Sequence, residues 1–209
     1  MLKFRTEIKI PKYPFQILPD SKMLFLGSCF ADNIGNFFID HEVNACVNPF
    51  GSLYNPASIA LALNFLINPD SYSDEYIYNF NNQWISFSHS TKFSHNDKSM
   101  FLNNIQEQLQ NSSSFLSQTD FVFITLGTAF VYNFIPRNLI VANCHKIPNT
   151  QFLKTMLQVD DVVKTLSAIL QSLKLMLPNL KIVFTISPIR HLSDGFHQNQ
   201  LSKSVLHLS

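Results

Sequence analysis

Apolar residues follow two patterns along this chain, short continuous runs and longer stretches with helical spacing. Continuous apolar runs, typical of strands that are buried on both faces, occupy residues 23–26, 45–47, 121–126 and 181–186. Apolar residues three or four positions apart, typical of amphipathic helices, occupy residues 31–39, 56–67, 98–116, 159–177 and 198–208. This alternation predicts an α/β fold, with a mostly parallel sheet covered by helices on both faces.

One stretch, residues 71–96, departs from both patterns. It mixes polar and aromatic residues without a clear period, so we interpret it as an aromatic insertion, with room for a hairpin, packed on the body of a single domain. Its rings either fill the core or form a surface on which sugars stack, and the sequence leaves both possibilities open. The aromatic residues are Tyr72, Tyr76, Tyr78, Phe80, Trp84, Phe87 and Phe93.

Charge and hydropathy narrow the range of partners. The net charge is +1, only 14% of the residues are charged, and no run of lysine and arginine occurs, so we expect neither nucleic acid nor a membrane as a partner. Residues 1–10 lack the apolar core of a signal peptide, and no apolar run is as long as a membrane span. These features predict a cytoplasmic protein.

The cysteines and the motif content argue against a bound cofactor. The three cysteines, Cys29, Cys46 and Cys144, are odd in number and have no C-x-x-C spacing, which favours reduced, mostly buried thiols. No pair of histidines has the spacing of a zinc site, and no glycine-rich nucleotide-binding motif is present. We therefore expect no metal and no cofactor.

The candidate chemistry lies where the predicted strands end. The carboxyl ends of parallel strands meet at one edge of a sheet, so we expect the polar motifs that follow the four strands to line one concave site. Ser28, at the junction of strand and helix, is a candidate nucleophile, and the first N–H groups of that helix are candidate donors to an oxyanion. The motifs are Gly27-Ser28, residues 48–51, residues 127–129 and residues 187–191.

Each motif also has a purely structural interpretation. Ser28 could cap the helix, and Gly51 and Gly127 could serve only as turns. His191 could be a hydrogen-bonded partner of the arginine before it. Cys29 is a second candidate nucleophile, although its position one residue into the helix favours a small buried residue.

Further motifs make the chain resemble the GSCFA domain family, named for the pentapeptide at residues 27–31. That family resembles a branch of the SGNH (GDSL-type) hydrolases, which implies a three-layer α/β/α sandwich with a flavodoxin-like sheet, and hydrolysis of acyl esters by a serine. By this resemblance Ser28 matches the nucleophile, Gly51 the glycine whose N–H joins the oxyanion hole, and Gly127 the glycine of the third sequence block. The motifs that carry it are Phe4-Arg5-Thr6-Glu7, Asn48-Pro49-Phe50-Gly51, Tyr54-Asn55-Pro56, Phe93-Ser94, Thr125-Leu126-Gly127-Thr128-Ala129, Val131-Tyr132, Ala142-Asn143-Cys144-His145-Lys146, Ser187-Pro188-Ile189-Arg190-His191, Asp194-Gly195 and Asn199-Gln200-Leu201-Ser202-Lys203.

Two departures from the SGNH pattern affect the catalytic groups. Ala129 stands where the third block usually has an asparagine that donates to the oxyanion, so Thr128 is the nearest substitute donor. The Asp-x-x-His motif that supplies the general base has no match here. We therefore expect the chain to be a truncated product or a gene fragment that lacks its last strand, its last helix and the catalytic base. The alternative is that His191 or His145 takes over as the base. An apolar flank left open by the truncation predicts self-association.

The resulting hypothesis is a serine hydrolase that cleaves an acyl ester, either small or carried on a carbohydrate. Its expected catalytic residues are Ser28 and His191. The oxyanion donors are assigned to Ser28, Gly51, Gly127 and Thr128, and substrate binding to Asn55, Asn143 and His145. Two alternatives stay open, a non-catalytic SGNH-like binding protein and an acyltransferase that passes the acyl group to a sugar hydroxyl.

Overall fold

The computed structural model describes residues 12–190 and 192–209. Its central element is a four-stranded parallel sheet in the order β2-β1-β5-β9, with each strand where a continuous apolar run predicts it. Counted along the chain, these are the second, first, third and fourth strands of the sheet, which is how a flavodoxin-like order begins. The strands are β1 (Met23–Gly27), β2 (Ala45–Val47), β5 (Phe121–Leu126) and β9 (Lys181–Ile186).

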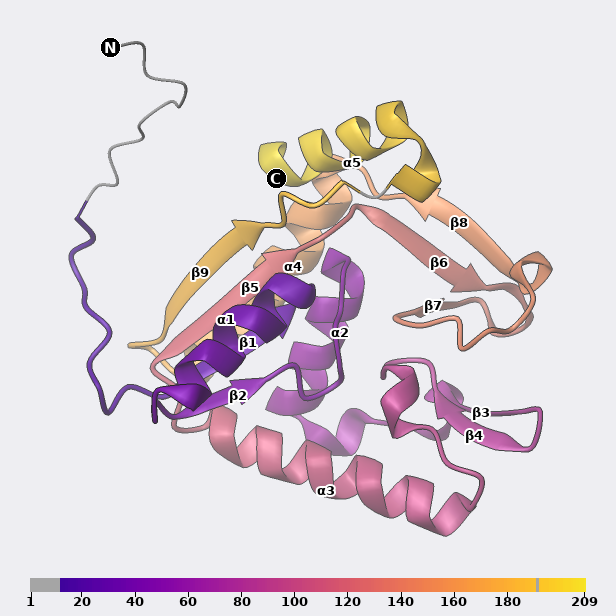
Figure 1. Ribbon diagram of the computed structural model, residues 1–209, viewed down its shortest axis with the longest axis horizontal. Coiled ribbons are helices and arrows are strands. Elements are labelled where there is room, and N and C mark those ends of the chain that lie inside the picture. Colours follow the sequence, from indigo (N-terminus) through magenta and orange to yellow (C-terminus); the bar gives the residue numbers. More distant parts are fainter. Residues whose placement is uncertain (1–11, 191) are drawn as a thin grey trace.

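The described part of the chain contains five α-helices, close to the predicted ranges. In Figure 1, α1 lies in front of the sheet and α4 behind it, and α5 lies above the ends of β5 and β9. The predicted three-layer α/β/α sandwich is therefore confirmed. None of the described helices is both long enough and apolar enough to cross a membrane. The helices are α1 (Cys29–Asp40), α2 (Pro56–Ile67), α3 (Lys98–Leu116), α4 (Val159–Met176) and α5 (Phe196–Leu208).

The residues of β1 explain why helices cover both faces of the sheet. Successive side chains of a strand point to opposite faces, and all five residues of β1 are buried. Met23 and Phe25 belong to a cluster with α1, whereas Leu24 and Leu26 belong to the main core with α2 and α4. A continuous apolar run is therefore what this position requires, because neither face of β1 meets water.

Residues 71–96 contain an antiparallel hairpin, formed by β3 (Ile77–Phe80) and β4 (Gln83–Ser86). Among its aromatic residues, Phe87 is fully buried and Tyr76 is nearly so, and both pack within apolar clusters. These two rings fill the interior rather than form a surface for sugars. Short 3-10 turns connect the larger elements here and elsewhere, at η1 (Pro69–Ser71), η2 (Asp74–Tyr76), η3 (Thr91–Phe93), η4 (Ile135–Arg137), η5 (Asn149–Gln151) and η6 (Leu192–Asp194).

A small antiparallel sheet between residues 130 and 156 has no counterpart in the sequence analysis. Its strands pair in the order β7-β6-β8, and they lie to the right of the main sheet in Figure 1. Each strand has only three to five residues, and most of those residues are half-buried. Residues 139–142 form a short apolar run, comparable to that of β2, that the sequence analysis did not assign to a strand. The strands are β6 (Phe130–Phe134), β7 (Leu139–Val141) and β8 (Phe152–Met156).

β9 is the edge strand of the main sheet, and an apolar groove lies beside it. The groove has a volume of about 490 Å³ and lies between α4, β9 and α5. Its apolar lining includes Val163, Leu170, Phe184 and Ile186, and Phe184 is 41% exposed. An open strand edge next to an apolar surface favours pairing with another chain. Self-association of two copies through this flank stays a prediction.

The self-association can be tested at Phe184. Replacing it with Lys should weaken association by about tenfold or more, because it places a charge in the apolar contact. Sedimentation equilibrium over a range of concentrations measures the dissociation constant. Leu175→Lys is the control, because Leu175 is 85% exposed on α4 and does not line the groove. A monomer at every concentration would contradict the prediction.

Candidate active site

Ser28 lies at the junction between β1 and α1, at the carboxyl edge of the sheet. Its backbone is extended, with φ −70° and ψ 177°, and it occupies the N-cap position of α1. Gly27 has φ +135°, and a Cβ at this residue would come within 2.2 Å of the Thr125 carbonyl oxygen on β5. The Ser28 N–H donates to that same oxygen at 3.1 Å. Only glycine lets β1 and β5 approach this closely at the strand end.

The hydroxyl of Ser28 does not cap the helix. It makes no capping hydrogen bond, and its Oγ is buried with no hydrogen-bond partner among the described residues. Buried polar atoms without partners are uncommon, and catalytic groups are one reason for them. Because the hydroxyls of Ser58 and Ser94 are also buried and unpaired, this property alone does not single out Ser28. Its place at the carboxyl edge does.

A network of polar side chains fixes the β1–α1 junction. Asn48, which follows β2, accepts from the Gly27 N–H through Oδ1 at 2.8 Å and donates through Nδ2 to Asp32 at 2.7 Å. Ser52 donates to the other oxygen of Asp32 at 2.6 Å. Asp32 lies one helical turn after Ser28, so the network ties the second strand end to the first turn of α1. Sequence reasoning missed Asp32, although its i, i+4 spacing from Ser28 was a signal.

The two glycines assigned to the oxyanion hole lie at the same edge as Ser28, but their N–H groups are engaged. The Gly51 N–H donates to the Asn48 carbonyl at 2.7 Å within a tight turn. The N–H groups of Gly127 and Thr128 both donate to the Tyr54 carbonyl, at 2.7 and 2.9 Å. Their roles as oxyanion donors stay predictions, and they require these hydrogen bonds to be exchanged.

α5 closes the edge from above. Ser202 bonds the Thr128 hydroxyl at 3.0 Å and accepts from the Ala129 N–H at 2.8 Å. Lys203 donates to the carbonyl oxygens of Gly127 and Ser187, at 2.5 and 2.6 Å, and burial lowers the pKa of its ammonium group. The ends of β5 and β9 are therefore held together by one turn of α5.

A cavity of about 300 Å³ lies between this edge and the small sheet. Thr128 and Asn55 line it, but Ser28 and Gly51 do not, so the strand-end residues that we expect to line one concave site do not all border this cavity. The Asn55 side chain caps α2 by accepting from the Ser58 N–H at 2.8 Å. The rest of the lining is Tyr54, Phe130, Tyr132, Val141, Ala142, Lys154, Ser193 and Asp194.

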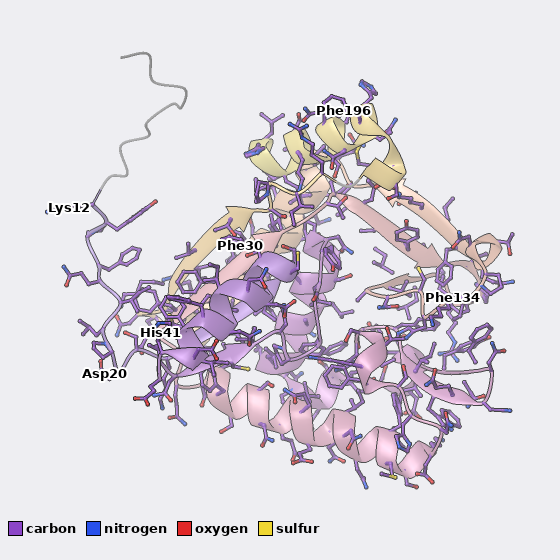
Figure 2. All side chains as sticks on the ribbon, viewed as in Figure 1. Lys12, Asp20, Phe30, His41, Phe134 and Phe196 are labelled. Carbon is purple, nitrogen blue, oxygen red and sulfur yellow. The ribbon has the colours of Figure 1, made fainter. Side chains whose placement is uncertain are left out.

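An ion pair closes one side of the cavity. Lys154, on β8, bonds the carboxylate of Asp194 in the turn before α5. The same ammonium lies 4.5 Å from the ring centre of Phe130 and 5.4 Å from that of Tyr132. Figure 2 labels Phe30 at the start of α1, Phe134 at the end of β6 and Phe196 at the start of α5, which locate these three elements in the view. The pair therefore links the small sheet to the fourth strand-end loop.

The structure places His145 and Asn143 in a different polar cluster, next to β4. Asn143 accepts from the His145 N–H at 2.8 Å, and the His145 ring bonds the Ser86 carbonyl at 2.7 Å through Nε2. Burial lowers the pKa of His145. No histidine among the described residues hydrogen-bonds Ser28, because its Oγ has no partner there. His191 lies outside the described residues, so its role as the base stays a prediction.

His89 is the centre of the polar cluster that contains His145. Its Nδ1 lies 2.7 Å from the Ser86 hydroxyl, which also accepts from the Tyr72 hydroxyl at 2.9 Å. Its ring packs 4.5 Å from Phe50. Burial, with smaller contributions from His145 and Lys92, lowers the pKa of His89 to about 3. The ring is therefore neutral in the folded protein near neutral pH.

Comparison with known proteins assigns the chain to a family. The model of the GSCFA family matches residues 22–209. The chain belongs to the GSCFA family. No curated protein and no solved structure matches it. In this GSCFA protein the family pentapeptide therefore forms the end of β1 and the start of α1, and the relation to SGNH hydrolases stays a proposal.

The β1–α1 junction of the GSCFA chain can be tested by adding one methyl group at Gly27. Gly27→Ala should lower the free energy of unfolding by about 1–3 kcal/mol for the positive φ, and overpacking against Thr125 should cost about 1–3 kcal/mol more. Gly195→Ala is the matched control, because Gly195 has φ +82° and no atom within 4 Å of an added Cβ. Urea unfolding measures both variants. Equal losses would contradict the close approach of β1 and β5.

The buried histidines predict loss of stability in acid. His89 has an ordinary pKa of about 6.5 when unfolded and about 3 when folded, so below pH 6.5 the unfolded state binds a proton that the folded state lacks. Stability should therefore fall from about pH 6.5 towards pH 3, by about 2 kcal/mol at pH 5 from His89 alone. His145 acts in the same direction.

Urea unfolding at pH 7.5 and pH 5 measures this difference. His89→Gln should remove most of the contribution of His89 to it, whatever the variant's stability at pH 7.5. His197→Gln, at an exposed position on α5, is the control and should leave the difference unchanged. A wild-type protein whose stability does not change between these two pH values would contradict a neutral buried His89.

Proposed function

We propose that this GSCFA protein is a serine-dependent hydrolase of acyl esters, with Ser28 as its nucleophile. The observation that carries the proposal is the hydroxyl of Ser28, which lies at the carboxyl edge of a parallel sheet and neither caps α1 nor has a hydrogen-bond partner among the described residues. Ligands of such sheets bind at this edge. A hydrogen-bonded network of three side chains, Asn48, Asp32 and Ser52, positions the turn that carries it.

The reaction would proceed through an acyl-enzyme. Ser28 Oγ attacks the ester carbonyl carbon while its proton passes to a base, for which His191 is the candidate. The bond to the alcohol then breaks, the alcohol leaves with that proton, and water releases the acyl group by the same steps. Adjacent N–H groups would stabilise the oxyanion. Those of Cys29 and Phe30 support this role, because the first N–H groups of a helix have no intrahelical acceptor and favour negative charge.

The cavity beside Thr128 supports a small, polar alcohol as the leaving group. Its volume of about 300 Å³ is at the lower end of the range for ligand sites. Hydroxyl, amide, carboxylate and ammonium groups line it beside aromatic rings, a mixture that can hydrogen-bond the hydroxyls of a sugar. An acyl group carried on a carbohydrate is therefore our proposed substrate class.

A non-catalytic binding protein is the second candidate. It is favoured by the engaged state of the proposed oxyanion donors, because the N–H groups of Ser28, Gly51, Gly127 and Thr128 all have protein acceptors. A binding protein would keep the cavity and use Ser28 only as part of its wall. The two candidates differ in one measurable property, the reactivity of the Ser28 hydroxyl.

Ser28→Ala should abolish hydrolysis of p-nitrophenyl acetate and labelling by a fluorophosphonate probe. Mass mapping should locate the label on Ser28 in the wild-type protein, because only an activated serine reacts with such probes. Ser58→Ala is the matched control: it removes another buried, unpaired hydroxyl, on α2, and should leave both readouts unchanged. His191→Ala should reduce the rate by about a hundred- to ten-thousand-fold if His191 is the base.

Other outcomes would redirect the proposal. Labelling at a different residue, or none at all, would leave the binding protein as the better interpretation. Transfer of the acyl group to an added sugar in place of water would indicate an acyltransferase that uses the same nucleophile.

A further inference from the structure

Tyr54 connects the strand-end motifs on which the proposed function depends. Its carbonyl oxygen accepts from the N–H groups of both Gly127 and Thr128, which anchors its backbone to the end of β5. Its side chain packs on Gly127, since a Cβ there would lie 3.1 Å from Tyr54 Cδ1 and 3.3 Å from Tyr54 Cβ. One end of the side chain is therefore placed at the third strand end.

The other end of the Tyr54 side chain reaches the first turn of α1. Its phenol lies close enough to the Ser52 hydroxyl for that group to lower the pKa of Tyr54, and the same Ser52 hydroxyl donates to Asp32 at 2.6 Å. Burial raises the pKa of the Tyr54 phenol, and the nearby charges of Cys29 and Asp32 raise it further. The phenol oxygen is therefore close to the residues that immediately follow Ser28.

These two positions fix the path of the ring between them. Ser28 lies beside β5, where its N–H donates to the Thr125 carbonyl, and Gly127 directly follows the end of that strand. A ring that runs from Gly127 towards Ser52 and Asp32 lies next to the β1–α1 junction. The backbone of the same segment also pairs with this junction, because the Leu53 N–H donates to the Gly27 carbonyl at 2.8 Å. Ser28 itself is only 1% exposed.

The cavity of about 300 Å³ also borders Tyr54. Tyr54 lines it, whereas Ser28 does not. At 37% exposure the Tyr54 side chain also borders solvent, so rotation about its χ1 bond has space, while the two backbone hydrogen bonds hold its main chain in place.

We propose that Tyr54 is a gating and specificity-determining residue, whose ring separates Ser28 from the cavity and must rotate before an ester can reach the serine. The alcohol part of the ester then occupies the cavity, and the acyl carbon lies over Ser28. The polar contact between the phenol and Ser52 holds the gate closed. This inference rests on the proposed function for its substrate, but the gate itself can be tested without any catalysis.

The test measures access to residue 28 with a thiol. Ser28→Cys is made in a Cys29→Ala background, and residue 28 is alkylated with iodoacetamide or with a bulky maleimide, each followed by mass mapping. Adding Tyr54→Ala should raise the alkylation rate by about tenfold or more, and more for the maleimide, because the open fraction no longer limits access. Tyr54→Phe keeps the ring but loses the polar contact of the phenol with Ser52, so it should raise the rate about two- to tenfold.

Two controls separate gating from loss of structure. Cys46 and Cys144 are half-buried thiols in the same molecule, and their alkylation rates should not change in the Tyr54 variants. A parallel increase at all three positions would show general loosening and overturn the proposal. Tyr13→Ala, at a tyrosine that is 65% exposed near the N-terminal end of the described chain, should change nothing.

The gate and the nucleophile can fail independently. An unchanged rate at residue 28 in both Tyr54 variants overturns the gate, even where Ser28 is labelled by the fluorophosphonate. A faster rate at residue 28, in a protein whose Ser28 takes no fluorophosphonate with or without Tyr54→Ala, supports the gate and overturns the hydrolase.

Discussion

The close approach of β1 to β5 at Gly27 is the constraint on which the rest of the site depends. With the Thr125 carbonyl oxygen only 2.2 Å from where a Cβ would lie, residue 27 must be glycine, and the chain must turn into α1 immediately after it. That turn places Ser28 at the carboxyl edge and directs its N–H to the same Thr125 oxygen. The Asn48 side chain accepts a hydrogen bond from the Gly27 N–H and donates one to Asp32, so it also fixes the first turn of α1. One backbone contact thus determines where the candidate nucleophile stands.

The structure describes this site in a closed arrangement. The Ser28 hydroxyl is buried, the N–H groups of Ser28, Gly51, Gly127 and Thr128 have protein acceptors, and Ser28 does not line the neighbouring cavity. A hydrolase can use such an arrangement only if some side chain moves, because catalytic hydrogen bonds often form only in the complex with substrate. Tyr54 is the residue that borders both Ser28's helix and the cavity. If no side chain moves, the same features describe a binding pocket whose serine is part of the wall.

Polar groups away from the edge have a different role. Tyr72, Ser86 and His89 form hydrogen bonds within a cluster that joins the β3–β4 hairpin to the main body, where the His89 ring packs on Phe50. Buried polar groups that are hydrogen-bonded favour one arrangement of the segments that carry them. A buried group that takes up a proton destabilises that arrangement, because its charge is buried. His145 belongs to this cluster rather than to the nucleophile. Its histidine side chain is therefore better explained by the packing of the hairpin than by proton transfer at Ser28.

The sequence by itself determined the sheet and its helices, because β1, β5 and β9 are read as continuous apolar runs and α4 as a stripe with helical spacing. It also located the Gly27-Ser28 junction, since a strand that ends in glycine before a helix is a local pattern. Only the tertiary structure decided what surrounds Ser28. The short strands β6, β7 and β8 are defined by pairing between residues that are well separated along the chain, so their short apolar runs did not identify them in the sequence. Tyr54 lies between Gly127 and Asp32, and His145 lies against Ser86. These placements likewise depend on which loops meet when the chain packs, and the spacing of residues along the chain does not predict which loops meet.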